Sequence, residues 1–216
     1  TDIVWWVISF FLASTIVLTF SRSAWLAFVI SVLVFVGFSL WFKKMPARHV
    51  FPLLGIVLLT LLLTVTFFRE PVFTRFEPTE RLEAKSLIER QTEYGMFDDV
   101  FLKNPVTGVG AGAYTVALYE IQPGQPAWTY QPMHNTILLI LGEVGIIGFL
   151  LLLRWVHSID QLSYRVARTR AGMFAMSLGT VLLVVALFDH YLWTSWTGFA
   201  LAAFVFAMMT RWSTEE

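Results

Sequence analysis

Long apolar runs constrain this chain more than any other feature of its sequence. A helix needs about 20 consecutive apolar residues to cross a bilayer, and runs close to that length recur along the chain. They are residues 3–20, 24–42, 50–68, 134–153, 171–188 and 197–210. Hydrophobic residues make up 57% of the sequence and charged residues 14%, against about a quarter charged in a soluble domain. The sequence therefore predicts an all-α, polytopic membrane protein with about six transmembrane helices.

Composition also excludes several classes of function. The chain has no cysteine, which rules out disulfides, thiolate catalysis and thiolate metal sites. The formal net charge is zero, so no nucleic-acid partner is expected. The first residue is Thr, and residues 1–20 lack the basic start and cleavage site of a signal peptide. We expect residues 1–216 to form one membrane domain, the C-terminal part of a longer protein.

Lysine and arginine in the short loops predict the orientation. The basic loops 43–49 and 154–170 hold most of them, so we expect both loops in the cytoplasm. Residues 21–23, 69–133 and 189–196 then lie on the outer side of the membrane. The 69–133 segment also carries basic residues, but long translocated loops escape the rule.

The 69–133 segment is predicted to be an outer subregion with amphipathic helices. Pro78 suits a first helical turn, and the pattern from there to Lys103 is helical. One apolar stripe is formed by Leu87, Tyr94, Phe97 and Phe101. Asn104 and Pro105 end this helix, and the GVGAG turn beginning at Gly108 follows. A short helix at 111–120 and a proline-rich loop at 121–133 complete the segment.

Four residues at the predicted outer side can carry chemistry. Arg22 is either an interfacial anchor or a ligand for an anion. Arg90 falls in the apolar stripe and so points towards the bundle, unless it pairs on a solvated face. His134 opens the fourth span and titrates near neutral pH, although a histidine there is also a common helix cap. Asp189 follows the fifth span and either caps a helix or pairs with one of the other three.

Two further features of the fourth span have structural interpretations. Glu143 faces away from His134 and lies about 13 Å deeper at 1.5 Å per residue, so we expect a buried hydrogen-bonding residue. Gly142, Gly145 and Gly148 would allow another helix to pack closely. Histidines and carboxylates show no metal-ligand spacing, and the sequence predicts neither a metal site nor a cofactor.

The order of three motifs resembles the O-antigen ligase and O-antigen polymerase superfamily. They are Pro105-Val-Thr-Gly108-Val-Gly110, then His134-Asn135, then Glu143-Val-Gly145-Ile-Ile-Gly148. The family often has an S-R-G/S sequence at the outer start of a helix, as around Arg22, and an Arg upstream of the glycine turn, as at Arg90. The resemblance implies a glycosyltransferase C-like fold and a metal-independent, inverting glycosyltransferase.

The same resemblance implies the substrates and the site. A glycan would move from an undecaprenyl-diphosphate carrier to an acceptor glycolipid or glycan, at the outer side of the bacterial inner membrane. His134 would take the acceptor proton, Arg22 and Arg90 would bind the diphosphate, and Asp189 would hold His134 or an arginine. We also expect substrate contacts from Asn135, Gly108 and Gly110.

Other functions remain open from the sequence. A polymerase of the repeat unit, or an oligosaccharyltransferase that acts on protein, differs only in the acceptor. From another class, a lipid-glycan transporter or a membrane scaffold would need no catalytic residues. A transporter should place polar residues along a path through its spans. Glu143 is the only ionisable residue of the sequence that lies deep in a predicted span, which argues against a transporter.

Overall fold

A computed structural model describes residues 2–43, 47–76, 81–165 and 169–214. Within these residues the chain forms helices, turns and loops, and no strand. The helices are α1 (Asp2–Val17), α2 (Arg22–Trp41), α3 (Ala47–Phe67), α4 (Arg69–Thr74), α5 (Arg81–Lys103), α6 (Tyr114–Ile121), the 3₁₀ turn η1 (Ala127–Thr129), α7 (Thr136–Arg165), α8 (Arg170–Phe188), α9 (Tyr191–Thr194) and α10 (Trp196–Thr214). The all-helical prediction is confirmed.

The predicted spans all fall on helices. In the described part of the chain, four of them are long and apolar enough to cross a membrane: α2, α3 from Val50, α7 to Ile159, and α8. The apolar parts of α1 and α10 are shorter. Exposed apolar side chains such as Phe11, Leu62 and Trp196 cover these helices, as expected of a surface that faces lipid. Residues 44–46 of the predicted basic loop and Pro78 lie outside the described residues.

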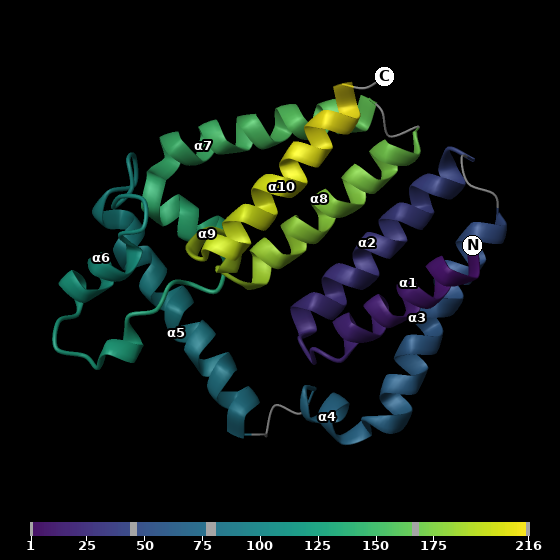
Figure 1. Ribbon diagram of the computed structural model, residues 1–216. Coiled ribbons are helices and arrows are strands. Elements are labelled where there is room, and N and C mark those ends of the chain that lie inside the picture. The colour runs from purple at the N-terminus through teal and green to yellow at the C-terminus, as the bar shows by residue number, and fades with distance from the viewer. Residues whose placement is uncertain (1, 44–46, 77–80, 166–168, 215–216) are drawn as a thin grey trace.

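The bundle packs α2 against α8, and α8 against α7 and α10. Between α2 and α8, Ser39 Oγ lies 3.6 Å from Met173 Sδ, and the Phe35 and Phe174 rings meet edge to face. The two helices run in opposite directions, so the start of α2, the end of α8 and the start of α7 lie at one end of the bundle (Figure 1). Arg22 and Asp189, which were expected on the same side, are therefore at the same end.

Helix α7 is longer than predicted and broken in the middle. It continues to Arg165, so most of the predicted 154–170 loop is helical. Gly145 has φ 67° and ψ −176°, a conformation that is strained for any residue with a Cβ. The chain changes direction there (Figure 1). The break follows Glu143 by two residues, so Glu143 lies on the same unbroken stretch as the start of α7.

The glycine-rich turn fits into this break. The N–H groups of Val109 and Gly110 donate to the carbonyls of Gly142 and Glu143, at 3.1 and 2.9 Å. The N–H groups of Ile146 and Ile147 donate to the carbonyls of Pro105 and Val106, at 2.9 and 3.2 Å. The turn thereby replaces helical hydrogen bonds that the break removes.

The close fit explains why glycines stand at these positions. A Cβ on Gly108 would lie 2.1 Å from the Glu143 carbonyl oxygen, so Gly108 is fitted closely to α7. The N–H of Gly110 donates to the carbonyl of Glu143. The absence of a Cβ at Gly145 leaves room for the backbone of this turn. A Cβ on Gly142 would touch the ring of Tyr114 in α6. The expected close packing of another helix is thus made at Gly142 by α6, whereas Gly145 is packed by the glycine-rich turn.

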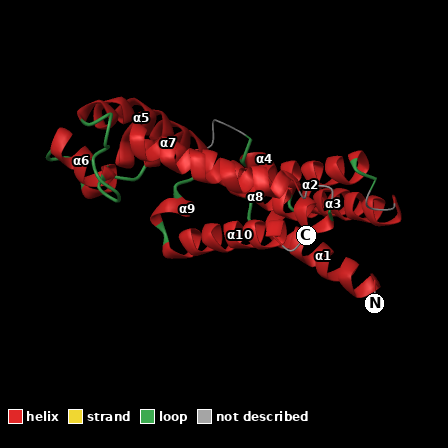
Figure 2. Cartoon of the chain, turned by 90° about the horizontal axis from the view of Figure 1, so that it is seen from above, coloured by secondary structure: helices red, strands yellow, loops and turns green. Residues whose placement is uncertain are grey.

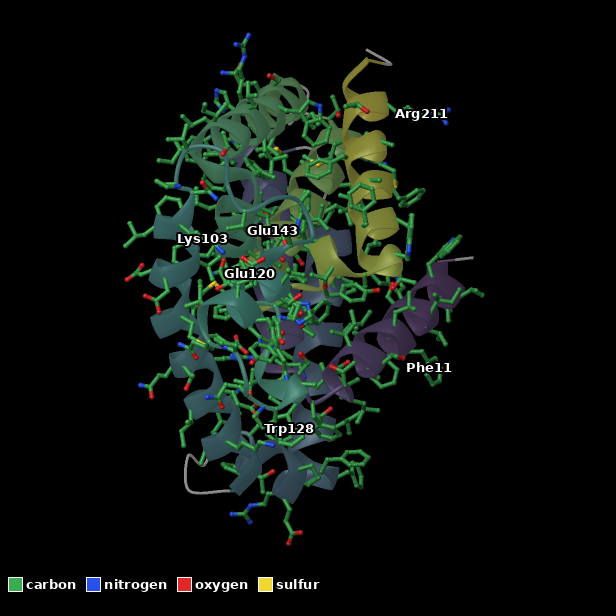
Figure 3. The ribbon with its side chains drawn as sticks, turned by 90° about the vertical axis from the view of Figure 1, so that its left-hand side faces the viewer. Phe11, Lys103, Glu120, Trp128, Glu143 and Arg211 are labelled. Atoms are coloured by element: carbon green, nitrogen blue, oxygen red, sulfur yellow. The ribbon has the colours of Figure 1, made fainter. Side chains whose placement is uncertain are left out.

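The polar 69–133 segment has its own core, which holds it on the first half of α7. Figure 2 shows α5 and α6 gathered at one end of the elongated molecule. The buried residues there are Val100, Tyr114, Ala117, Leu118, Met133 and Leu139. Lys103 at the end of α5 forms an ion pair with Glu120 of α6 (Figure 3).

The buried face of α5 is rotated from the predicted stripe. Glu93 and Val100 are buried and Phe97 is half-buried, whereas Tyr94 is 45% exposed. Arg90 is half-buried at the edge of this face. The side chain of Leu87 lies outside the described part. On the face that packs against the bundle, the carboxylate of Glu93 is therefore buried where the predicted stripe would have buried Tyr94.

Candidate functional site

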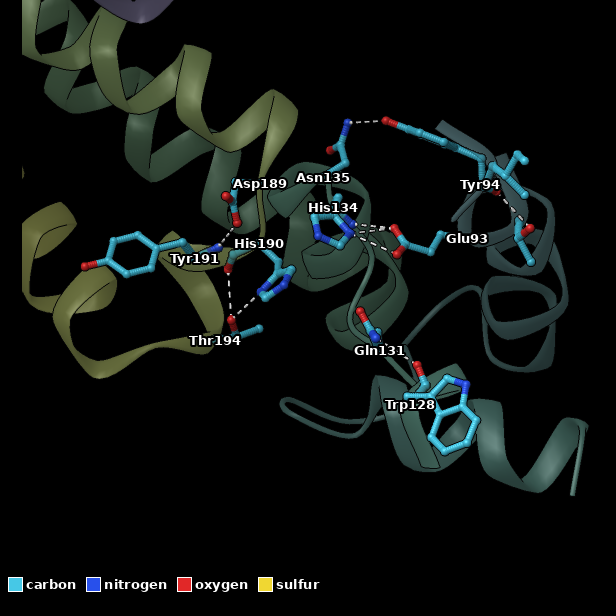
Figure 4. A network of polar contacts seen from close by, with 12 residues as sticks. Glu93, Tyr94, Trp128, Gln131, His134, Asn135, Asp189, His190, Tyr191 and Thr194 are labelled. Atoms are coloured by element: carbon cyan, nitrogen blue, oxygen red, sulfur yellow. Dashed lines mark hydrogen bonds and ion pairs between the residues drawn. The ribbon is translucent and has the colours of Figure 1, made fainter. Parts of the chain in front are cut away.

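A buried carboxylate holds the histidine that precedes α7. Both carboxylate oxygens of Glu93 lie 2.9 Å from Nδ1 of His134 (Figure 4). The backbone N–H of His134 also donates to Glu93 Oε2, at 3.0 Å. Because a carboxylate accepts hydrogen bonds, the neutral imidazole carries its proton on Nδ1 and leaves the lone pair of Nε2 available.

This contact makes His134 a stronger base. The hydrogen bond to Glu93 raises the pKa of His134 above its ordinary value, and the negative charges of Glu93 and Asp189 act in the same direction. Partial burial and the positive charge of Arg90 oppose the rise. The imidazole thus has an oriented lone pair and an increased proton affinity, which are the properties of a general base.

Arg90 lies one helical turn before Glu93 on α5, where its charge acts on His134. Its Nε is buried and has no hydrogen-bond partner. A buried N–H without a partner costs free energy, and a guanidinium binds phosphate oxygens in a forked geometry. Arg90 is therefore suited to bind an anionic group beside His134.

Asn135 and Asp189 mainly hold helix ends in place. Asn135 Oδ1 accepts from the N–H of Leu138, and its Nδ2 donates to the carbonyl of Leu187. Asp189 Oδ1 accepts from the N–H of Tyr191, at 2.9 Å. The expected hydrogen bond from Asp189 to His134 is not formed, because Glu93 occupies Nδ1. Asp189 still acts on His134 through its charge.

A second histidine lies against the first. The rings of His134 and His190 are 5.1 Å apart and meet edge to face. Nδ1 of His190 lies 2.7 Å from the Thr194 hydroxyl, which itself donates to the His190 carbonyl (Figure 4). Burial lowers the pKa of His190, and the neighbouring His134 contributes to the decrease. The two rings therefore have opposite tendencies towards protonation.

Glu143 is buried and joins three parts of the chain. Its Oε2 accepts from the N–H of Gly112 and from Nε1 of Trp193, both at 2.7 Å. Its Oε1 lies 3.4 Å from the N–H of Tyr114. The expectation of a buried hydrogen-bonding residue is confirmed. Its partners come from the segment before α6 and from α9.

Arg22 is bonded in a different place. Its Nη1 donates to the carbonyl of Arg75, where α4 ends, at 3.1 Å. Of the four residues grouped from the sequence, Arg90 and Asp189 act on His134 through their charges, and the structure adds Glu93 and His190 as contacts of His134. Glu93 had a detectable signal, because it lies three residues after Arg90 and four before Phe97, on the same helical face.

No three histidine or carboxylate side chains are gathered as a metal site in the described part of the chain. The described groups near His134 are the carboxylates of Glu93 and Asp189, the imidazole of His190 and the guanidinium of Arg90. This set can bind an anion and move a proton.

The comparison with protein families decides the family. The model for O-antigen ligase matches residues 7–153, which is more than half of the chain. The chain belongs to the O-antigen ligase family. The match includes α2, α5, the glycine-rich turn and the first half of α7, and therefore Arg22, Arg90, Glu93 and His134. Comparisons with curated proteins and with solved structures gave no match. The protein is thus a multi-pass membrane protein of the O-antigen ligase and polymerase superfamily.

Proposed function

We propose that this protein is a membrane glycosyltransferase of the O-antigen ligase type. It transfers a glycan from an undecaprenyl-diphosphate carrier to an acceptor hydroxyl, at the periplasmic side of the bacterial inner membrane. The observation that carries the proposal is the contact of the buried Glu93 with the half-buried His134, beside the unpartnered Nε of Arg90. A base and a phosphate-binding cation are the two groups that this transfer needs.

The reaction forms one bond and breaks one. Nε2 of His134 takes the proton from the acceptor hydroxyl while the oxygen bonds to the anomeric carbon. The bond from that carbon to the diphosphate oxygen breaks, and the electron pair leaves with the diphosphate. Attack opposite the leaving group inverts the anomeric centre. Glu93 stabilises the imidazolium that results, because its carboxylate already accepts from Nδ1.

Arg90 neutralises the leaving group in this proposal. Negative charge on the diphosphate increases as the anomeric bond breaks, and a preorganised guanidinium stabilises that charge most in the transition state. Arg22, at the same end of the bundle, contributes to binding the diphosphate or the carrier. The arginines supply the positive charge that a metal ion supplies in other phosphate chemistry, so the proposed step needs no metal.

The acceptor distinguishes a ligase from a polymerase or a protein oligosaccharyltransferase of the same superfamily. The contacts around His134 favour none of the three. A transporter is less well supported, because the carboxylate of Glu143 is held by N–H donors from two fixed segments. Such a carboxylate is suited to hold one arrangement of the chain.

Reconstitution tests the proposal. The purified protein in liposomes is mixed with undecaprenyl-diphosphate glycan and with one of three acceptors: a lipid A–core, a second lipid-linked repeat unit or an acceptor peptide. Glycan transfer to the lipid A–core establishes a ligase, and transfer to either of the others identifies the corresponding alternative. Release of no diphosphate with any acceptor would refute the glycosyltransferase proposal.

A further inference from the structure

A cavity of about 430 Å³ lies beside the His134 site. Its lining includes Ala111, Tyr114, Thr115, Glu143, Trp193 and Thr194. The volume is in the range of small-molecule sites, which combine an apolar and aromatic lining with a few placed polar groups. None of the transfer chemistry described above uses this cavity.

Glu143 is the carboxylate in the lining of this cavity. Glu143 is 2% exposed, and the donors it has among the described residues are uncharged N–H groups. Its Oε1 has only the long 3.4 Å contact with Tyr114, so the oxygen can accept a further hydrogen bond. A cavity with this charge repels phosphate and favours a ligand with neutral hydroxyl donors.

Tyr114, Trp193 and Phe199 give the cavity aromatic surfaces, and the first two have contacts that bear on the site. The indole of Trp193 is fixed by its bond to Glu143. Tyr114 is buried, and its hydroxyl has no hydrogen-bond partner. Burial raises the pKa of Tyr114, and the charge of Glu93 adds to the rise. Tyr114 therefore connects the cavity lining with the carboxylate that holds His134.

A second connection runs through α9. Thr194 lines the cavity, and its hydroxyl is hydrogen-bonded to Nδ1 of His190. The ring of His190 in turn contacts the ring of His134. From the position, charge and lining of the cavity, we infer that it binds one uncharged sugar ring of the glycan substrates. The diphosphate is bound by Arg90, outside the cavity lining. This inference rests on the proposed glycosyltransferase function.

A matched pair of alanine substitutions tests the sugar site. Ala111→Trp places an indole at the cavity lining and leaves the hydrogen bonds of Glu143 in place. Ala127→Trp puts the same side chain on η1, at another exposed alanine of the polar segment, away from the cavity. Both proteins are purified in detergent and mixed with core oligosaccharide freed of lipid A, or with repeat-unit glycan freed of its carrier. Saturation-transfer NMR measures binding of each sugar without requiring turnover.

We expect the wild-type protein and Ala127→Trp to bind one of the two sugars equally well. Ala111→Trp should weaken that binding about tenfold or more. If Ala111→Trp weakens binding of the core oligosaccharide, the cavity binds the acceptor. If it weakens binding of the repeat-unit glycan, the cavity binds the donor. Equal binding by Ala111→Trp and Ala127→Trp overturns the inference, as does a wild-type protein that binds neither sugar. The reconstituted transfer assay judges the enzymatic function separately.

Discussion

Glu93 contacts His134 twice, through the ring at Nδ1 and through the backbone N–H. The carboxylate comes from α5 and the histidine from the residue pair just before α7, so the contact joins the polar segment to a membrane helix. One side chain thus orients the imidazole, increases its basicity and fixes the start of the span. Because Glu93 raises the pKa of His134, the pH dependence of the proposed reaction should change when Glu93 is replaced.

Glu93→Gln should change the pH profile of transfer. His134 acts as a base only above its pKa, which Glu93 raises. A neutral glutamine removes the charge, the pKa of His134 falls, and the acidic limb of kcat/KM moves to lower pH. We expect the maximal rate to fall roughly tenfold or more, because the neutral amide stabilises the imidazolium less.

The control for this variant is Glu89→Gln, an exposed carboxylate of the same helix that pairs with Lys85. Its pH profile should match that of the wild-type protein. If Glu93→Gln keeps the acidic limb where the wild-type protein has it, His134 is not the titrating base.

Gly145→Ala should destabilise the protein. The added Cβ would lie 2.4 Å from the N–H nitrogen of Gly108 and from the carbonyl oxygen of Val106, at a positive φ. Both neighbours are backbone atoms of the turn that fills the α7 break, so neither can move cheaply. We expect a loss of about 2 kcal/mol or more in the free energy of unfolding, seen as a lower thermal midpoint in detergent.

Gly95→Ala is the matched control within α5. No atom lies within 4 Å of its added Cβ, and its backbone is helical. Alanine there should stabilise the helix by about 0.5–1 kcal/mol. Equal midpoints for Gly145→Ala and Gly95→Ala would refute the fitted-turn explanation.

The membrane helices were predictable because each depends on its own sequence. Long apolar runs fix the spans whatever surrounds them, and the boundaries of α2 and α8 agree closely with the prediction. The break at Gly145 was not predictable from the run that contains it. At this break, residues 105–110 supply hydrogen bonds to the residues on either side of Gly145, and that contact joins distant parts of the chain.

The same reason explains what was missed in the site. Arg90 and His134 stood out by residue type and position, and the structure brings them together. Glu93 was not singled out from the sequence, because its burial depends on where α5 packs against α7. Asp189 was expected to hold His134 or an arginine, or to cap a helix, and its Oδ1 accepts the local N–H of Tyr191. Long-range packing therefore decided which acid serves the histidine.

Arg90→Lys should lose most of the activity. Lysine keeps the positive charge but lacks the planar fork and the buried Nε. We expect kcat/KM for the lipid-linked donor to fall at least about tenfold, about 1.4 kcal/mol of transition-state stabilisation. Arg154→Lys, at an exposed position of α7, should behave like the wild-type protein. Similar losses in both variants would remove the specific role of Arg90.

Cysteine labelling tests the orientation in the membrane. The chain has no cysteine, so Gln122→Cys and Gln161→Cys each introduce a single thiol at an exposed position. In cells with a permeabilised outer membrane, an impermeant maleimide should label Gln122→Cys and not Gln161→Cys. The reverse pattern would place the His134 site in the cytoplasm and contradict a periplasmic transfer.

The most direct test of the mechanism compares His134→Gln with the wild-type protein. Glutamine can still hydrogen-bond Glu93 but cannot take a proton from the acceptor. Single-turnover transfer from lipid-linked glycan to acceptor is measured on protein that is normally folded and inserted. With His134 as the base, the rate for His134→Gln should fall by roughly 10²–10⁴, as it should for His134→Ala. A rate for His134→Gln close to that of the wild-type protein would contradict the account and leave His134 a helix-capping residue.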